Sequence, residues 1–144
     1  GLIGYKSLPG GGTTDYAVDI FHQALKNNTY ECFLKADMAL PMMYMSDAIK
    51  ATIDIMQVPA EQIKNRGSYN ISAMSFNPDD VAQAIQKHIQ DFTITYAPDF
   101  RQEIAENWPA SIDDSEARAD WNWNHEYDLE RMVEDMLTNL QPSA

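Results

Sequence analysis

The stretch Leu8-Pro9-Gly10-Gly11-Gly12-Thr13-Thr14-Asp15-Tyr16-Ala17-Val18-Asp19-Ile20-Phe21 joins a glycine-rich loop to the start of a helix. Consecutive glycines let the backbone come close to another group, because glycine has no Cβ and tolerates positive φ. Thr and Asp commonly precede a helix, and the apolar residues that follow have helical spacing. The stretch therefore predicts a loop that opens directly onto a helix N-terminus.

Two interpretations of this loop are open. Free N–H groups and the positive end of the helix dipole attract anions, such as a phosphate or an amino-acid carboxylate. Alternatively, the glycines only connect a strand to a helix, and Thr13 or Thr14 is an N-cap. The loop is not a P-loop, because no Gly-Lys-Ser/Thr follows, and it lacks the Gly-x-Gly-x-x-Gly pattern of dinucleotide sites.

Strand and helix patterns alternate along the rest of the chain. We expect strands at 1–4, 30–34, 42–45, 69–74 and 92–96. Helices are expected at 14–26, from Ser46 to the residue before Pro59, from Asn77-Pro78 onward, at 99–107 and 114–120, and from Asp128 onward. Strands separated by helices predict an α/β fold with parallel strand pairing.

Several of these segments carry specific expectations about burial. Ser46 should cap its helix, and Ile49, Ile53 and Met56 should form the buried stripe of that helix. In the helix that begins at Asn77-Pro78, the buried face is expected to comprise Val81, Ile85, His88 and Ile89. The methionines at 38, 42, 43 and 45 are expected to form a core or pocket wall, because methionine fills irregular apolar gaps.

Composition limits the classes of partner. The 144 residues suit one domain and carry a net charge of −12, which would repel nucleic acid and anionic membranes. The sequence contains no apolar run of about 18 residues, the length that a membrane-spanning helix needs. The single Cys32 cannot form an internal disulfide, which suits a reducing compartment and predicts a cytoplasmic location.

The titratable residues do not form a convincing catalytic or metal-binding pattern. His22, His88 and His125 lie far apart and have no ligand-like spacing with Cys32, so we expect no metal site. His22 and His88 are better explained as helix residues at the edge of a core. The pairs Asp79-Asp80 and Asp113-Asp114 stand where helices begin, so helix capping explains them better than acid–base catalysis.

Read as a string, residues 9–21 resemble the short-chain type of L-threonine 3-dehydrogenase, a branch of the extended short-chain dehydrogenase/reductase superfamily. Further stretches resemble that family in the same order: LPMMYMSDA (40–48), SYNISAMSF (68–76), RQEIAENWP (101–109) and IDDSEARADW (112–121). The resemblance covers nearly the whole chain but only the C-terminal part of the family's sequence. It implies the end of the main parallel sheet of a Rossmann-like fold together with the smaller substrate-binding lobe.

The family's nucleotide fingerprint and its catalytic Tyr-x-x-x-Lys are not found here. None of the seven tyrosines is followed four positions later by lysine, and the chain begins at Gly1 rather than at methionine. We therefore expect residues 1–144 to be a single C-terminal lobe whose N-terminal nucleotide-binding half is absent. The chain alone should contain no catalytic residue and be inactive.

For the whole enzyme, the resemblance implies NAD-dependent oxidation of the 3-hydroxyl of L-threonine to 2-amino-3-oxobutanoate, by a homodimer. Within this chain it implies substrate binding by Gly11, Gly12, Thr13 and Thr14. Leu2 or Ile3, expected just past the end of a strand, would contact the nicotinamide end of the cofactor.

Two other functions are open. The chain could be the equivalent lobe of a nucleotide-sugar epimerase or reductase of the same superfamily, although residues 10–16 fit the threonine enzymes better. It could also be a noncatalytic acidic binding module that retains this lobe. An upstream reading frame that continues through Tyr-x-x-x-Lys would support an enzyme, whereas a start codon at Gly1 would support a module.

Overall fold

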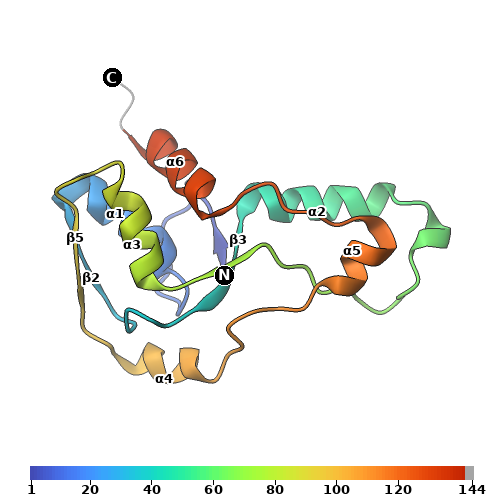
Figure 1. Ribbon diagram of the computed structural model, residues 1–144, viewed down its shortest axis with the longest axis horizontal. Coiled ribbons are helices and arrows are strands. Elements are labelled where there is room, and N and C mark those ends of the chain that lie inside the picture. Colours follow the sequence, from blue (N-terminus) through green and yellow to red (C-terminus); the bar gives the residue numbers. More distant parts are fainter. Residues whose placement is uncertain (142–144) are drawn as a thin grey trace.

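A computed structural model describes residues 1–141, in which helices pack around two small sheets (Figure 1). The strands are β1 (Leu2–Ile3), β2 (Thr29–Cys32), β3 (Leu40–Tyr44), β4 (Met74–Phe76) and β5 (Thr93–Tyr96). The helices are α1 (Tyr16–Asn27), α2 (Met45–Gln57), α3 (Pro78–Gln86), α4 (Phe100–Glu106), α5 (Ser115–Trp121) and α6 (Leu129–Leu140), with a 3₁₀ turn at Ala60–Gln62.

Parallel pairing is confirmed in both sheets. β1 pairs in parallel with β3, with Leu2 opposite Met43, and β2 pairs in parallel with β5 along its whole length. β4 joins the other edge of β3 in the antiparallel direction, with Leu40 opposite Phe76. The strand expected at 69–74 is therefore mostly wrong, because the paired residues begin only at Met74. The α/β class is confirmed.

Helix α1 is the centre of the larger of two hydrophobic clusters. Its buried residues include Tyr16, Ile20 and Phe21, none of which has exposed surface. They pack against β2, α3 and α6. The helix ends where Asn28 adopts the left-handed conformation at φ 55° and donates its N–H to the Ala24 carbonyl. We call this cluster, which also contains residues of β3, α3 and α6, the main core.

A smaller second cluster lies away from the main core. It consists of Met43, Ala51, Ala117, Trp121 and Trp123, which come from β3, α2, α5 and the segment after α5. In Figure 1, α2 and α5 extend to the opposite side of the molecule from β2 and β5. The two clusters meet at β3, because Met42 is buried in the main core and Met43 in the second cluster. Alternate side chains of a strand point to opposite faces of its sheet.

The expectations for α2 are wrong in two respects. The N-cap residue is Tyr44 rather than Ser46, and the helix begins at Met45, which is itself 39% exposed. The expected core stripe faces outward, since Ile49 is 54%, Ile53 48% and Met56 80% exposed. The helix instead packs through the face that contains Asp47 and Ala51. Helical spacing identifies a stripe, but it cannot tell whether the described part of the chain covers it.

The other helix starts agree better with the sequence. Asn77 caps α3 as expected and forms a capping box with Asp80, and the Asp99 and Asp128 side chains cap α4 and α6. α3 ends at Gln86, earlier than the apolar pattern suggested, so His88 is exposed and Ile89 only partly buried. The burial expected for His88 is therefore wrong.

Buried polar groups join α2 and β3 to the C-terminal segment. The Asp47 carboxylate, 1% exposed, accepts the N–H groups of Glu126 at 2.8 Å and Tyr127 at 3.0 Å. Tyr44 donates its hydroxyl to Asp135 on α6 and packs its ring 4.6 Å from that of Tyr127. A buried carboxylate is tolerated when charge-assisted hydrogen bonds replace its hydration. Here they fix the path of residues 126–127 across α2.

Candidate functional site

The glycine-rich loop is held by the residue that precedes α1. Asp15 occupies the N-cap position but makes no side-chain cap bond. Its Oδ2 instead accepts the N–H of Gly10 at 2.7 Å and that of Gly12 at 2.9 Å. Gly11, between them, has φ +94°, a conformation that favours glycine. The protein's own carboxylate therefore occupies these two N–H groups, so they are not the anion site that the sequence suggested.

Thr13 and Thr14 lie at the end of this loop. Thr13 is 8% exposed and Thr14 is half-buried. Neither side chain caps α1. The interpretation of Thr13 or Thr14 as an N-cap is therefore wrong. Both hydroxyls keep their capacity to bind a polar ligand.

The Thr14 side chain reaches the beginning of β1. A Cβ added at Gly1 would lie 2.6 Å from Thr14 Cβ and 2.8 Å from the Met42 sulfur, so only glycine fits at this position. Leu2 and Ile3 form β1 itself rather than following a strand end. Leu2 is 57% exposed, whereas the Ile3 side chain is 1% exposed in the main core. Of these two side chains, only that of Leu2 can contact a ligand.

A crevice of about 360 Å³ lies beside Gly1 and Leu2. Its remaining lining residues come from β3, α2 and the segments around residues 72 and 112: Pro41, Met42, Met43, Ala48, Thr52, Ile71, Ser72, Ala73 and Ile112. The lining contains hydroxyl groups from Thr52 and Ser72 but no Lys, Arg or His. The crevice therefore suits a small, largely apolar group better than one with several negative charges.

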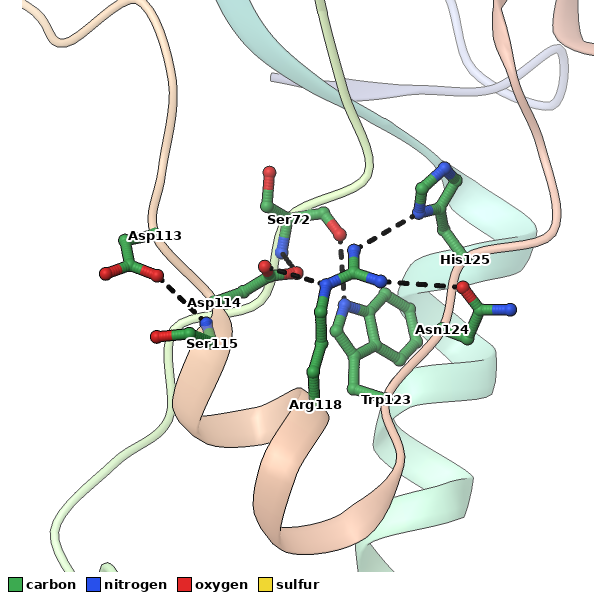
Figure 2. Close-up of polar contacts among 8 residues, drawn as sticks. All are labelled: Ser72, Asp113, Asp114, Ser115, Arg118, Trp123, Asn124 and His125. Atoms are coloured by element: carbon green, nitrogen blue, oxygen red, sulfur yellow. Dashed lines mark hydrogen bonds and ion pairs between the residues drawn. The ribbon is translucent and has the colours of Figure 1, made fainter.

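Arg118 is the centre of a polar network that reaches the crevice lining through Asp114 and Ser72 (Figure 2). Its Nε donates to Asp114 Oδ1 at 2.9 Å, while its other nitrogens lie 3.5 Å from Asn124 Oδ1 and 3.4 Å from His125 Nδ1. Asp114 also accepts the N–H of Ser72 at 3.1 Å. The Ser72 carbonyl accepts the Trp123 indole N–H at 3.0 Å, so both backbone groups of this lining residue are fixed.

This network settles the role of the pair Asp113-Asp114. Asp113 accepts the Ser115 N–H at 3.0 Å, whereas Asp114 turns toward Arg118 (Figure 2). Burial raises the pKa of Asp114, but the hydrogen bonds from Arg118 and Ser72 and the Arg118 charge outweigh it and hold that pKa below its usual range. Asp114 occupies the N-cap position of α5 but makes no side-chain cap bond, so the capping expected of it is wrong. Neither carboxylate has the raised pKa of a general acid.

Arg101 is a contact of the loop that sequence reasoning missed. From α4 it donates Nη1 to the Gly11 carbonyl at 3.4 Å, across 90 positions of sequence. Its guanidinium packs 3.2 Å from the centre of the Phe33 ring and pairs with Asp99. The hydrogen bond from Arg101 holds the pKa of Asp99 below its usual range. No local pattern places a residue of α4 against a loop near the N-terminus.

Within the described residues, no three His, Cys, Asp or Glu side chains lie close enough to hold a metal ion. Among the helices of residues 1–141, none combines the length and apolar character needed to cross a bilayer.

Similarity to known proteins covers almost the entire chain, although no family model matches it. A GalE-like L-threonine dehydrogenase from Cupriavidus necator superposes with a TM-score of 0.94 at 60% identity over 98% of this chain. The mitochondrial L-threonine 3-dehydrogenase of Bos taurus is 53% identical over 138 residues, or 95% of the chain. Over nearly its whole length the chain is thus similar to the C-terminal portion of L-threonine 3-dehydrogenases and of epimerase/dehydratase family members.

The similarity covers only part of each relative. The chain spans 46% of the Cupriavidus protein and 37% of the bovine one, and matches their C-terminal portion. An uncharacterised epimerase/dehydratase of Staphylococcus saprophyticus is also 46% identical over 142 residues. A nucleoside-diphosphate-sugar epimerase from Agrobacterium tumefaciens shares the fold, with a TM-score of 0.75 at 14% identity. The expected architecture, the C-terminal part of an extended short-chain dehydrogenase, is confirmed.

Proposed function

We propose that residues 1–144 are the substrate-binding C-terminal part of an enzyme that uses NAD to oxidise the 3-hydroxyl of L-threonine to 2-amino-3-oxobutanoate. The observation that carries this proposal is the loop of residues 10–14, whose shape is fixed by Asp15 and whose two threonine side chains are not used to cap α1. That loop lies in a chain 60% identical to a threonine dehydrogenase. A small amino acid offers the ammonium, carboxylate and hydroxyl groups that such hydroxyls can bind.

In this proposal the loop and the start of β1 hold opposite sides of the reacting carbon. Thr13 and Thr14 would bind the polar groups of threonine, whereas the Gly12 N–H and the Gly11 carbonyl already bind Asp15 and Arg101, so Gly11 and Gly12 would contribute the shape of the loop. Leu2 offers an exposed apolar side chain beside the crevice, which fits one face of a nicotinamide ring, whereas Ile3 can contribute only its backbone. NAD supplies the hydride acceptor, and the residues of this chain would orient the substrate toward it.

Proton removal requires residues from outside this chain. No tyrosine here is followed by lysine four positions later, and the carboxylates at 113 and 114 are used in structural contacts. We therefore place the catalytic tyrosine and lysine in the N-terminal half of the whole protein, which also binds most of the cofactor. The homodimer and the cytoplasmic location remain predictions.

An uncovered surface supports this division into two halves. The outward stripe of α2, formed by Ile49, Ile53 and Met56, lies on a helix that packs against β1. The edge of β1 that does not face β3 has no strand partner within residues 1–141. Parallel sheets are normally covered on both faces and continue through further strands. We propose that the N-terminal half pairs with this edge and covers the α2 stripe.

The epimerase alternative is disfavoured by charge. A nucleoside diphosphate carries at least two negative charges, and proteins usually bind such groups with Arg or Lys. The crevice lining has neither residue, and Asp15 adds a carboxylate to the loop beside it. A noncatalytic module is disfavoured because the chain keeps the loop with Thr13 and Thr14 at the position where the threonine enzymes resemble it.

The decisive experiment uses the full-length protein. We expect the purified protein to reduce NAD when L-threonine is added, as followed by NADH absorbance. A nucleotide sugar offered at the same concentration should give no NADH and no epimerised product. Conversion of the nucleotide sugar without oxidation of threonine would overturn the proposal.

A further inference from the structure

We propose that Asp15 and Arg101 are positioning residues that hold the glycine-rich loop in the conformation in which Thr13 and Thr14 face the substrate. The inference rests on the proposed function for the identity of that substrate. It concerns two residues that do not themselves touch threonine, and whose side chains bind opposite kinds of backbone group in the loop.

Asp15 holds the loop through its N–H groups. One carboxylate oxygen accepts from both Gly10 and Gly12, at 2.7 and 2.9 Å, and the Asp15 N–H donates to the Gly12 carbonyl at 3.1 Å. An N-cap aspartate normally gives its side chain to the helix, where it contributes about 1 kcal/mol of stability. Here that cap bond is absent. The carboxylate is used for the shape of the loop instead.

Arg101 holds the loop through a carbonyl. Its Nη1 donates to Gly11, the residue with φ +94°, at 3.4 Å. The guanidinium is held in place before it reaches the loop, because Nε and Nη2 bind the Asp99 carboxylate at 2.6 to 3.1 Å and Phe33 lies against its face. A planar group bound on two sides loses little further freedom when it makes a third contact.

Two such contacts are needed because the glycine backbone of the loop has a high conformational entropy, which the contacts restrict. Three consecutive glycines have the most flexible backbone that a chain can offer. A binding loop that is ordered before the ligand arrives does not lose that freedom on binding. Without Asp15 or Arg101 the loop would adopt many conformations, and the positions of the Thr13 and Thr14 hydroxyls would vary from one conformation to the next. Threonine would then bind less tightly and react in fewer orientations.

The test compares variants of the full-length protein. Asp15→Ala should lower kcat/KM for threonine roughly ten- to a hundredfold, mainly through KM, and leave the KM for NAD unchanged. Asp15→Asn should stay within about threefold of the wild type, because one amide oxygen can accept both N–H groups as Oδ2 does. Arg101→Met should cause a smaller loss than Asp15→Ala, because its bond to Gly11 is long.

Asp128→Ala is the matched control. Asp128 caps α6 by accepting the Arg131 N–H at 2.9 Å and has no contact with the loop. This variant should lower the melting temperature without changing the KM for threonine. The proposal is overturned if Asp15→Ala keeps the wild-type KM, if Asp15→Asn is as impaired as Asp15→Ala, or if the KM for NAD rises equally.

Hydrogen exchange separates this inference from the proposed function. In the full-length protein, Asp15→Ala should accelerate exchange of the Gly10 and Gly12 amides at least about tenfold, whereas Asp128→Ala should not. If the wild-type protein does not oxidise threonine but the amides respond in this way, the proposed substrate is wrong and the loop contact is right. Unchanged amide exchange in Asp15→Ala overturns the inference whatever the substrate.

Discussion

At the scale of single residues, Thr13 is the most informative side chain. Thr13→Ala in the full-length protein should lower kcat/KM for L-threonine and leave the affinity for NAD nearly unchanged. Loss of one hydrogen bond to a charged group costs about 1.5–3 kcal/mol, or roughly ten- to over a hundredfold in kcat/KM. Steady-state kinetics and the melting temperature of the same variant provide the measurement.

Thr14→Ala separates binding from packing. Thr14 lies against Gly1, so its truncation leaves a gap beside the start of β1 as well as a missing hydroxyl. Because neither threonine caps α1, we expect little loss of stability in Thr13→Ala. If both variants melt at lower temperature but keep the wild-type kcat/KM for threonine, these hydroxyls are structural and the assignment of the site is wrong.

Cys32 gives a second prediction at this scale. The thiol is fully buried in β2, and burial raises its pKa to about 11. The native protein should therefore not react with iodoacetamide at pH 8, because the thiolate is scarce and inaccessible. Mass spectrometry of native and urea-unfolded samples checks this, and only the unfolded chain should be alkylated. Stoichiometric labelling of the native protein would contradict it.

The sign of the linked pH effect follows from the raised pKa of Cys32. The folded state favours the neutral thiol, so this group stabilises the fold fully below its ordinary pKa of 9.0. That contribution is lost as the pH rises through the interval up to about 11. Cys32→Ala should remove this part of the alkaline loss of stability.

Asp15 and Arg101 show which features of the loop the sequence could predict and which it could not. Residue types and spacing were enough to predict a loop followed by a helix, and the start of α1 lies within two residues of the expected position. They could not show that the Asp15 carboxylate turns back to Gly10 and Gly12 instead of capping the helix. Nor could they show the contact of Arg101 with Gly11, because a bond across 90 positions depends on how α4 packs.

At the scale of elements, α2 shows why a correct pattern led to a wrong face. Its length was well predicted, but the stripe of Ile49, Ile53 and Met56 is exposed, whereas the face with Asp47 and Ala51 is buried. Apolar periodicity indicates that a face is suited to burial, and under our proposal the N-terminal half supplies the cover that the described residues do not. The apolar face of α1, in contrast, is covered within the described residues.

Ile53→Asp tests this interpretation of α2. In the isolated chain the substitution should change the free energy of unfolding by no more than about 0.5 kcal/mol, as for most surface positions. In the full-length protein it should destabilise by about 3 kcal/mol or more, because an unpaired charge would be buried under the N-terminal half. Urea denaturation of both proteins, with and without the substitution, provides the comparison.

A charged substitution at a known exposed site is the control for Ile53→Asp. Thr138 is exposed on α6, away from the α2 stripe, so Thr138→Asp should have only a small effect in both proteins. Equal, small effects of Ile53→Asp in the isolated chain and in the full-length protein would mean that the α2 stripe is not covered by the N-terminal half. Self-association of the isolated chain that Ile53→Asp abolishes would show that a second copy can cover the stripe instead.

At the scale of the whole molecule, the main core and the second cluster differ in size. The main core gathers buried residues from α1, α3, α6 and four strands, whereas the second cluster has five buried residues between α2, α5 and the segment around Tyr69. The sequence predicted most elements of both but not their separation, because that depends on Met42 and Met43 pointing to opposite faces of β3. The smaller cluster also lies beneath the helix whose outer stripe is uncovered.

This inequality predicts that the isolated chain unfolds in two steps. A small cluster buries less apolar area and should open at a lower free energy than the main core. Tryptophan fluorescence reports on it selectively, because Trp121 and Trp123 are 5% and 2% exposed within it, whereas Trp108 is 44% exposed elsewhere. In urea, we expect the fluorescence transition to have a lower midpoint than the loss of helix measured by circular dichroism.

Trp108→Phe should leave the fluorescence midpoint unchanged. In the full-length protein, where the N-terminal half would cover α2, the fluorescence midpoint should rise toward that of the main core. Coincident transitions in the isolated chain would show instead that the Asp47 contacts and β3 couple the two clusters into one cooperative unit.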